Sequence, residues 1–257
     1  MLIVLPPSEG KRSPSKGPAL SNSSLSFADH LSAPRDEVQK RLIALASGPR
    51  NRAMKTLGLT PGLAEELQHD ASLLTAPSAY AIEIYTGVLY EGLDWKSLSP
   101  SAKKRSESQL LIVSALFGAL RPLDLIPRYR LSMDAVLPRI GALNGYWRRH
   151  LPQVLDELKA EVIVDMRSQT YARAWTPNPA ITIGVRVFVE KSGRRSIVTH
   201  MAKKTRGEVA RALLSLTKTP TSIDALAEAL RRHFRIEVVN PATSKMQHLL
   251  NVILDAE

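Results

Sequence analysis

The chain of 257 residues contains no cysteine, and this absence excludes several classes of function. It can form neither a disulfide nor a thiolate metal site, and it has no cysteine nucleophile, which agrees with a reducing compartment. Aromatic residues are also scarce: only four Phe are present, and no stretch alternates basic with aromatic residues. A stacking platform for single-stranded nucleic acid is therefore disfavoured.

Histidine is the remaining side chain that commonly binds transition metals, and its spacing is unfavourable. The six histidines are scattered, and no two have the i, i+4 spacing that places two ligands on one face of a helix. We therefore expect no metal site and no cofactor. Only His200, which lies beside a basic cluster, is kept as a candidate site residue.

Long apolar runs are missing as well. No segment has eighteen uninterrupted apolar residues, and the apolar run at residues 1–5 is too short for a signal peptide or a membrane span. We expect a cytoplasmic protein that is a monomer and has no contact with a membrane.

Acidic residues are too few to balance the basic ones, and the net charge of +11 is unevenly distributed. Residues 1–120 carry 13 basic and 11 acidic side chains, whereas residues 121–257 carry 22 and 13. A basic half attracts polyanions such as nucleic acid, acidic lipid or phosphorylated small molecules. Because the charge is spread over more than a hundred residues, a role in solubility alone stays open.

The hydrophobic content of 44% is enough for one large core. Short apolar runs predict buried strands, and apolar stripes at helical spacing predict helices. We expect strands at 1–5, 109–114, 161–166 and 234–240, a hairpin over 180–201 turning at Ser192-Gly193, helices at 35–46, 78–87, 100–109, 145–160 and 203–217, and an exposed loop over 11–33. This irregular order predicts a mixed α/β (α+β) fold, a single compact domain over 1–257 with a central mixed sheet surrounded by helices, rather than a doubly wound sheet.

Two short helical patterns within residues 50–70 flank a turn that runs from Gly58 to Gly62. A helix-hairpin-helix uses such a turn to offer backbone N–H groups to a phosphate. Lys55 favours this interpretation, and the three acidic residues between 65 and 70 oppose it. A plain helix pair with no role in DNA binding is the alternative.

Four stretches share one pattern, in which an apolar strand or turn ends in polar residues. They are residues 7–11, 114–130, 165–171 and 200–207. If the strands share a sheet, polar groups at their carboxyl ends converge on a crevice where ligands bind. The alternative is that each polar cluster is only the loop that its strand requires.

The stretch 114–133 places three arginines and an aspartate directly after an apolar run. Arg121, Arg128 and Arg130 present forked donors that suit phosphate or carboxylate, and Asp124 can hold one of them in place. Prolines in the stretch stiffen the loop. The alternative is an Asp124–arginine pair within the loop and a solvated Arg128.

Ser8 and Lys11 have the S-x-x-K spacing of some acyl-transfer enzymes. That motif needs a helix that holds both side chains on one face, whereas Ser8 follows Pro-Pro and lies next to Gly10 in an expected turn. We therefore interpret Ser8 and Lys11 as anion-binding groups.

Six motifs occur together along nearly the whole chain. They are "LPPSEGK" at 5–11, Tyr85-Thr86-Gly87, "SALFGALRPLDLIPRYRLSM" at 114–133, Tyr146-Trp147, Ser168 with Tyr171, and "AKKTRG" at 202–207. In these residues the sequence resembles the peroxide stress protein YaaA family.

The resemblance implies a cytoplasmic protein that protects bacteria from hydrogen peroxide by limiting free iron and so DNA damage. It also implies a compact α/β fold with a positively charged cleft, a helix-hairpin-helix and binding to double-stranded or distorted DNA. Together with the patterns above, it identifies as candidate DNA- or anion-binding residues Ser8, Lys11, Gly58, Gly62, Arg121, Asp124, Arg128, Tyr129, Arg130, Ser168, Tyr171, Lys203, Lys204 and Arg206.

Two hypotheses of different classes follow. The first is a DNA-binding stress protein without enzymatic activity, which the net charge, the candidate hairpin and the resemblance favour. The second is an enzyme that acts on a phosphorylated or nucleobase-like small molecule, with a small anionic ligand in the same cleft. It is favoured by Ser, Tyr, Lys and Asp groups that duplex binding would not require. We expect the first.

Overall fold

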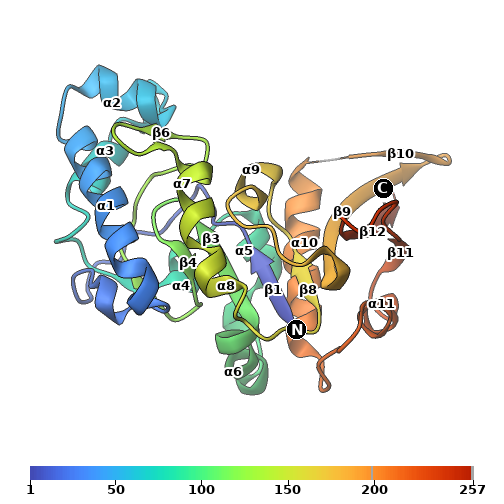
Figure 1. Ribbon diagram of the computed structural model, residues 1–257. Helices are drawn as coiled ribbons and strands as arrows, with labels where there is room; N and C mark the ends of the chain where they lie inside the picture. Colours follow the sequence, from blue (N-terminus) through green and yellow to red (C-terminus); the bar gives the residue numbers. More distant parts are fainter. Residues whose placement is uncertain (198, 256–257) are drawn as a thin grey trace.

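The computed structural model describes residues 1–197 and 199–255, which form a mixed sheet surrounded by helices (Figure 1). The strand order is β11-β12-β9-β8-β1-β3-β4, and β10 pairs with β9. The strands are β1 (Leu2–Leu5), β3 (Leu110–Ser114), β4 (Gly118–Leu120), β8 (Ile163–Asp165), β9 (Thr182–Lys191), β10 (Arg194–Ser196), β11 (Arg235–Val239) and β12 (His248–Asp255). Two small pairs lie apart: β2 (Ala79–Tyr80) with β5 (Leu125–Ile126), and β6 (Val136–Leu137) with β7 (Gly141–Ala142).

The middle of the sheet is parallel. Strands β12, β9, β8, β1 and β3 all run in one direction, while β4 and β11 are antiparallel to their neighbours. All residues of β1, β3 and β8 are buried, as expected of parallel strands that are covered on both faces. The predicted fold class, a single mixed α/β domain, is confirmed.

The helices cover the faces and ends of this sheet. They are α1 (Ala28–Ala46), α2 (Arg50–Leu57), α3 (Glu66–Ala71), α4 (Ala81–Ile84), α5 (Val88–Leu93), α6 (Pro100–Gln109), α7 (Leu143–His150), α8 (Pro152–Leu155), α9 (Gln169–Ala172), α10 (Thr199–Ser215) and α11 (Ile223–Arg231). Helices α1, α2 and α3 gather at the β4 end, and α11 lies beside β11 (Figure 1). No helix in the described ranges is long and apolar enough to span a membrane.

Several predicted elements have different bounds in the structure. Helix α1 begins at Ala28 rather than at residue 35, because Leu31 extends the buried stripe through a segment whose composition is typical of a loop. The expected helix over 78–87 is short: α4 ends at Ile84, and Gly87 precedes α5 instead of ending a helix. The predicted helix at 145–160 is divided into α7 and α8 by Pro152.

The hairpin prediction is confirmed. Strands β9 and β10 are antiparallel and join at Ser192 and Gly193, which both have left-handed backbone angles, with φ of 50° and 74°. Two consecutive left-handed residues are typical of the tight turns that match the twist of a hairpin. Helix α11 and strand β12 were not among the expected elements, although β12 is a short apolar run like the other strands.

Candidate functional site

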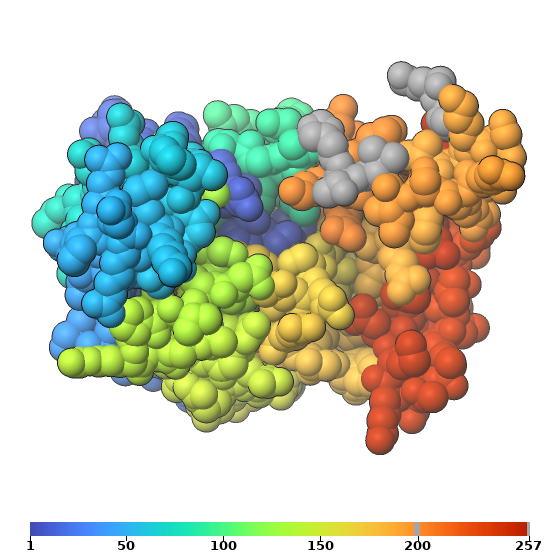
Figure 2. All heavy atoms as spheres, turned by 90° about the horizontal axis from the view of Figure 1, so that it is seen from above, coloured from blue at the N-terminus to red at the C-terminus, as the bar shows by residue number. Residues whose placement is uncertain are grey.

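Three of the four polar stretches meet at one edge of the sheet. Strands β1, β3 and β8 are parallel neighbours, so the loops that follow them leave from the same carboxyl edge. Figure 2 looks onto this edge and shows the surface hollowed between segments in dark blue, green, yellow and orange. These colours correspond to the loop after β1, the α4–α5 region, the α9 region and the start of α10. We call this cluster the carboxyl-edge site.

Lys11 lies at the centre of the carboxyl-edge site with its side chain buried. Its Nζ donates hydrogen bonds to the carbonyl oxygens of Ser8 at 2.6 Å and Glu9 at 3.4 Å. It also lies 4.4 Å from the ring centroid of Tyr129 and 5.6 Å from that of Tyr85. Burial, assisted by the nearby Arg130 charge, lowers the pKa of the Lys11 amine to about 7. The charged form of this amine is therefore less favoured than that of an exposed lysine.

A chain of hydroxyl groups lies beneath Lys11. Ser114 Oγ is 2.8 Å from the Tyr129 hydroxyl, which is 2.9 Å from the Tyr85 hydroxyl. Because Ser114 Oγ accepts the backbone N–H groups of Leu116 and Phe117, both its lone pairs are engaged, and it must donate to Tyr129. In the hydrogen bond between Tyr129 and Tyr85, either hydroxyl can be the donor. Burial raises the pKa of both tyrosines, which stay protonated.

Asp70, on α3, approaches Lys11 from another part of the chain. Its Oδ1 accepts the backbone N–H of Arg130 at 2.7 Å, whereas its Oδ2 is buried and has no hydrogen-bond partner among the described residues. Burial raises the pKa of the Asp70 carboxyl to about 8, opposed by the Arg130 hydrogen bond and the Lys11 charge. The site thus holds a buried amine and a buried carboxyl that both titrate near neutrality.

Ion pairs border this buried centre. Arg128 contacts Glu66 of α3 at 2.5 Å, and Arg130 contacts Glu9 at 3.0 Å. The structure therefore brings Ser8, Lys11, Tyr129 and Arg130 together, with Arg128 alongside them through Glu66.

Arg121 and Asp124 do not join the carboxyl-edge site. The Arg121 guanidinium donates to the carbonyl oxygens of Ser108 at 2.7 Å and Leu110 at 3.1 Å, and Leu110 is the first residue of β3. Asp124 accepts the backbone N–H of Arg121 and both the N–H and the hydroxyl of Ser26, each at 2.8 Å. Strand β4 runs antiparallel to β3 and so returns the chain to the amino edge before Arg121.

The turn between β3 and β4 is held by contacts within the protein. Gly118 has φ of 72°, and a Cβ there would lie 2.5 Å from the Trp147 ring. The buried Arg35 donates to the carbonyl oxygens of Phe117 at 3.0 Å and Ala119 at 2.7 Å. The glycine of the long central motif is therefore needed for packing against Trp147.

The polar residues after β8 divide into buried and exposed groups. Asp165 and Arg167 form a buried bidentate ion pair with distances of 2.9 Å and 2.8 Å, so the charge of Asp165 is neutralised locally. Tyr171 lies against Ser132, and burial raises the pKa of its hydroxyl to about 12. Ser168 is exposed directly before α9.

Helix α10 adds basic residues beside these loops. Arg206 is partly buried, donates from Nε to the Val185 carbonyl oxygen at 3.3 Å and lies near Asp165; burial lowers its pKa. Lys203 and Lys204 are exposed and make no ion pair with any residue in the described ranges. The side chain of His200 lies outside the described part of the structure.

The expected order of helix, glycine turn and helix is present in residues 50–70. Helix α2 ends at Gly58, which has φ of 64°, and Gly62 lies exposed in a 3₁₀ turn before α3. Phosphate binding by this turn stays a prediction. Helix α3 also supplies Glu66 and Asp70, two of the acidic residues that opposed a DNA-binding hairpin, to the carboxyl-edge site.

Sequence reasoning did not identify Asp70, Ser114 or the hydroxyl of Tyr85 as site residues. Ser114 and Tyr85 lie in motifs that were recognised, but their hydrogen bonds depend on tertiary contacts. Asp70 has no sequence signal of its own, because it is one of three acidic residues between 65 and 70. Within residues 1–197 and 199–255, no three His, Asp or Glu side chains gather as ligands for a metal ion.

Comparison with known proteins agrees with these motifs. The family model described as peroxide stress protein YaaA matches residues 1–238. A UPF0246 protein of Streptomyces coelicolor is 40% identical over 259 residues, covering 99% of this chain and 98% of that protein. A UPF0246 protein of Corynebacterium glutamicum is 36% identical, covering 83% and 84%, and one of Shewanella baltica is 35% identical, covering 68% of each. Because the family model matches residues 1–238 and these relatives align over most of the chain, the chain belongs to the peroxide stress protein YaaA family.

Proposed function

We propose that this protein protects cells during peroxide stress by binding double-stranded DNA through a basic cleft at the carboxyl edge of the sheet. The observation that carries this proposal is the pair of exposed lysines, Lys203 and Lys204, which have no ionic partner among the described residues. They belong to the half of the chain that holds 22 of the 35 basic residues. Exposed, unpaired cations are the groups that gain most from phosphate contacts.

The limiting of free iron is proposed from family membership alone. Binding of duplex DNA would place the protein where iron-dependent damage to DNA occurs. This connects DNA binding with the limiting of free iron. A cytoplasmic location follows from the same proposal.

The test is duplex DNA affinity at fixed salt for Lys203→Ala/Lys204→Ala. We expect affinity to fall about tenfold or more, equivalent to about 1.4 kcal/mol, and to fall similarly for all sequences, because phosphate contacts carry no sequence information. The matched control is Lys218→Ala, an exposed lysine beyond the other end of α10, which should bind as the wild type does. Unchanged affinity in the double variant would contradict the proposal.

A second function, an enzyme acting on a phosphorylated or nucleobase-like small molecule, is favoured by one observation. Lys11 and Asp70 are both buried, and Asp70 Oδ2 has no hydrogen-bond partner among the described residues. A duplex cannot reach such groups, whereas an amine and a carboxyl that titrate near neutrality can exchange protons with a small substrate. Arg130, at the border, would orient the anionic part of that substrate.

Lys11→Met separates the two functions. This substitution keeps the apolar stem and removes the amine, and its effect is measured as duplex affinity and as survival of peroxide in cells that lack the native protein. Lost protection with unchanged DNA affinity would support the enzyme and contradict DNA binding as the protective activity. Unchanged protection would contradict the enzyme. A thermal unfolding curve close to that of the wild type shows that the variant is folded.

A further inference from the structure

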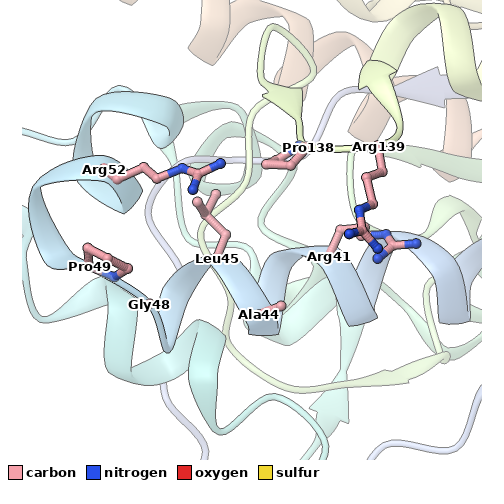
Figure 3. Close-up of a pocket in the computed structure, with 8 residues that line it drawn as sticks. All are labelled: Arg41, Ala44, Leu45, Gly48, Pro49, Arg52, Pro138 and Arg139. Atoms are coloured by element: carbon pink, nitrogen blue, oxygen red, sulfur yellow. The ribbon is translucent and has the colours of Figure 1, made fainter.

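A second hollow lies away from the carboxyl-edge site. It has a volume of about 330 Å³ and is formed by the end of α1, the start of α2 and the turn between β6 and β7 (Figure 3). Its floor is apolar, with Leu45, Pro49 and Pro138 among the lining residues. Three arginines, Arg41, Arg52 and Arg139, complete the wall. Within this lining the only charged side chains are these guanidinium groups.

The three guanidinium groups line the same hollow, and the acidic side chains that pair with them are too few to neutralise their charge. Figure 3 shows the side chains of Arg41 and Arg139 together on one side of the hollow and Arg52 extending over it from the other. Arg41 is paired with Glu37 at 2.7 Å. Arg52 and Arg139 form no ion pair with any residue of the described ranges. Like charges held near one another repel, so the arrangement favours a bound anion.

The backbone at Arg139 supports the same interpretation. Its φ is 67°, in the left-handed region that glycine adopts most easily. Glycine would fit this turn with less strain, whereas this chain has an arginine there whose guanidinium extends to the hollow. Strained positions retained for the side chain that they present cluster at ligand sites.

We propose that this hollow binds a phosphate group through the forked N–H donors of Arg41, Arg52 and Arg139. Planar guanidinium groups match phosphate oxygens in pairs, and the apolar floor accommodates the carbon that a phosphate ester carries. The phosphate is that of a DNA backbone or of a phosphorylated small molecule. In Figure 1, α2 and β6 lie at the top of the molecule, as α9 does.

The first experiment uses inorganic phosphate as the probe, with binding to the wild type, Arg52→Ala/Arg139→Ala and Arg50→Ala followed by calorimetry. Arg50 is an exposed neighbour that does not line the hollow and serves as the matched control. We expect at least a fivefold loss of phosphate affinity in the double variant and less than a twofold change in the control. Equal phosphate binding by all three proteins, or none by the wild type, overturns the proposal.

The single variant Arg139→Gly tests whether a loss of phosphate binding is caused by misfolding. It removes the guanidinium and relieves the left-handed strain, so we expect a thermal midpoint at or above that of the wild type together with weaker phosphate binding. A lowered midpoint with unchanged phosphate binding would show that Arg139 serves the fold, and would overturn the proposal.

A duplex DNA titration identifies the source of the phosphate. If the site holds a DNA phosphate, the double variant loses about tenfold in duplex affinity, and the slope of log affinity against log salt becomes shallower by about 0.9, the change expected for one lost phosphate contact. If it holds a phosphorylated small molecule, duplex affinity is unchanged while phosphate binding is lost. Because Arg52 and Arg139 are separate from Lys203 and Lys204, the failure of this proposal is distinguishable from failure of the cleft.

Discussion

Lys11 places its amine where an ammonium ion is poorly solvated. The carbonyl oxygens of Ser8 and Glu9 replace some of the lost water, and two tyrosine rings lie close to the amine. The charged form of Asp70 is also poorly solvated, because its buried Oδ2 has no hydrogen-bond partner among the described residues. A pair of this kind destabilises the folded state in its charged form, and binding sites are where proteins commonly retain such groups.

The two shifted pKa values change stability in opposite directions as the pH rises. Burial raises the pKa of Asp70 from 3.8 to about 8, so the folded state holds an extra proton between these values and stability falls as pH rises through this range. Burial lowers the pKa of Lys11 from 10.5 to about 7, so the unfolded state holds the extra proton and stability rises from about pH 7 to 10. The contribution of the pair is therefore lowest between about pH 7 and 8.

We expect Asp70→Asn to remove the fall in stability between about pH 4 and 8, since an amide does not titrate there. The measurement is the free energy of unfolding by urea at a series of pH values. Glu65→Gln, an exposed acid on the same short segment, is the control and should leave the profile unchanged. If the free energy of unfolding of Asp70→Asn depends on pH as that of the wild type does, the pKa of the Asp70 carboxyl is not raised by folding.

At the scale of the element, the packing of α10 against α5 positions the basic residues. Gly92 contacts the carbonyl of Lys204, and Gly207 contacts the backbone of Leu89 and Leu93, so closely that neither position has room for a Cβ. The two glycines allow the helix backbones to approach, which places Lys203 and Arg206 beside the carboxyl edge. The glycine of "AKKTRG" is thus explained by helix packing.

We expect Gly207→Ala to destabilise the fold by about 1–3 kcal/mol, because the added methyl collides with backbone that cannot move alone. The matched control is Gly145→Ala in α7, where nothing lies within 4 Å of the new Cβ. That variant should gain up to about 1 kcal/mol from the higher helix propensity of alanine. Urea unfolding measures both, and equal effects at the two positions would refute the close helix contact.

At the scale of the whole molecule, the net charge of +11 produces a field that attracts polyanions. Many arginines are already paired, including Arg128 with Glu66 and Arg130 with Glu9. The exposed lysines of α10, and Arg52 and Arg139 of the second hollow, have no ion-pair partner among the described residues. This favours a few distinct phosphate contacts over a uniformly basic surface.

If the protein contacts about four phosphates, log duplex affinity should fall linearly with log salt with a slope of about −3.6, because each contact releases condensed counterions. In Lys203→Ala/Lys204→Ala the slope should become shallower by about 1.8. Fluorescence anisotropy at five salt concentrations gives both slopes. An affinity that does not respond to salt would exclude phosphate contacts as the basis of binding.

Local pattern by itself determined much of this protein. The apolar runs of β1, β3 and β8 are typical of strands that are buried on both faces of a sheet. Ser192-Gly193 permits the left-handed turn between β9 and β10. The mixed fold class and the family followed from such patterns. The apolar run of β12 carries a comparable signal, and Leu31 shows that the buried stripe of a helix can continue through a segment whose composition is typical of a loop.

Only the tertiary structure decided which polar residues meet. Arg121 and Arg130 lie nine positions apart, yet the antiparallel direction of β4 sends Arg121 to the amino edge while the chain returns Arg130 to the carboxyl edge. Asp70 and Lys11 are far apart in sequence and become neighbours because Arg130 contacts both Asp70 of α3 and Glu9 of the loop after β1. Residue type and spacing specify a strand or a turn through local sterics and burial, but strand direction and helix packing depend on the whole chain at once, and they determine where each charge lies.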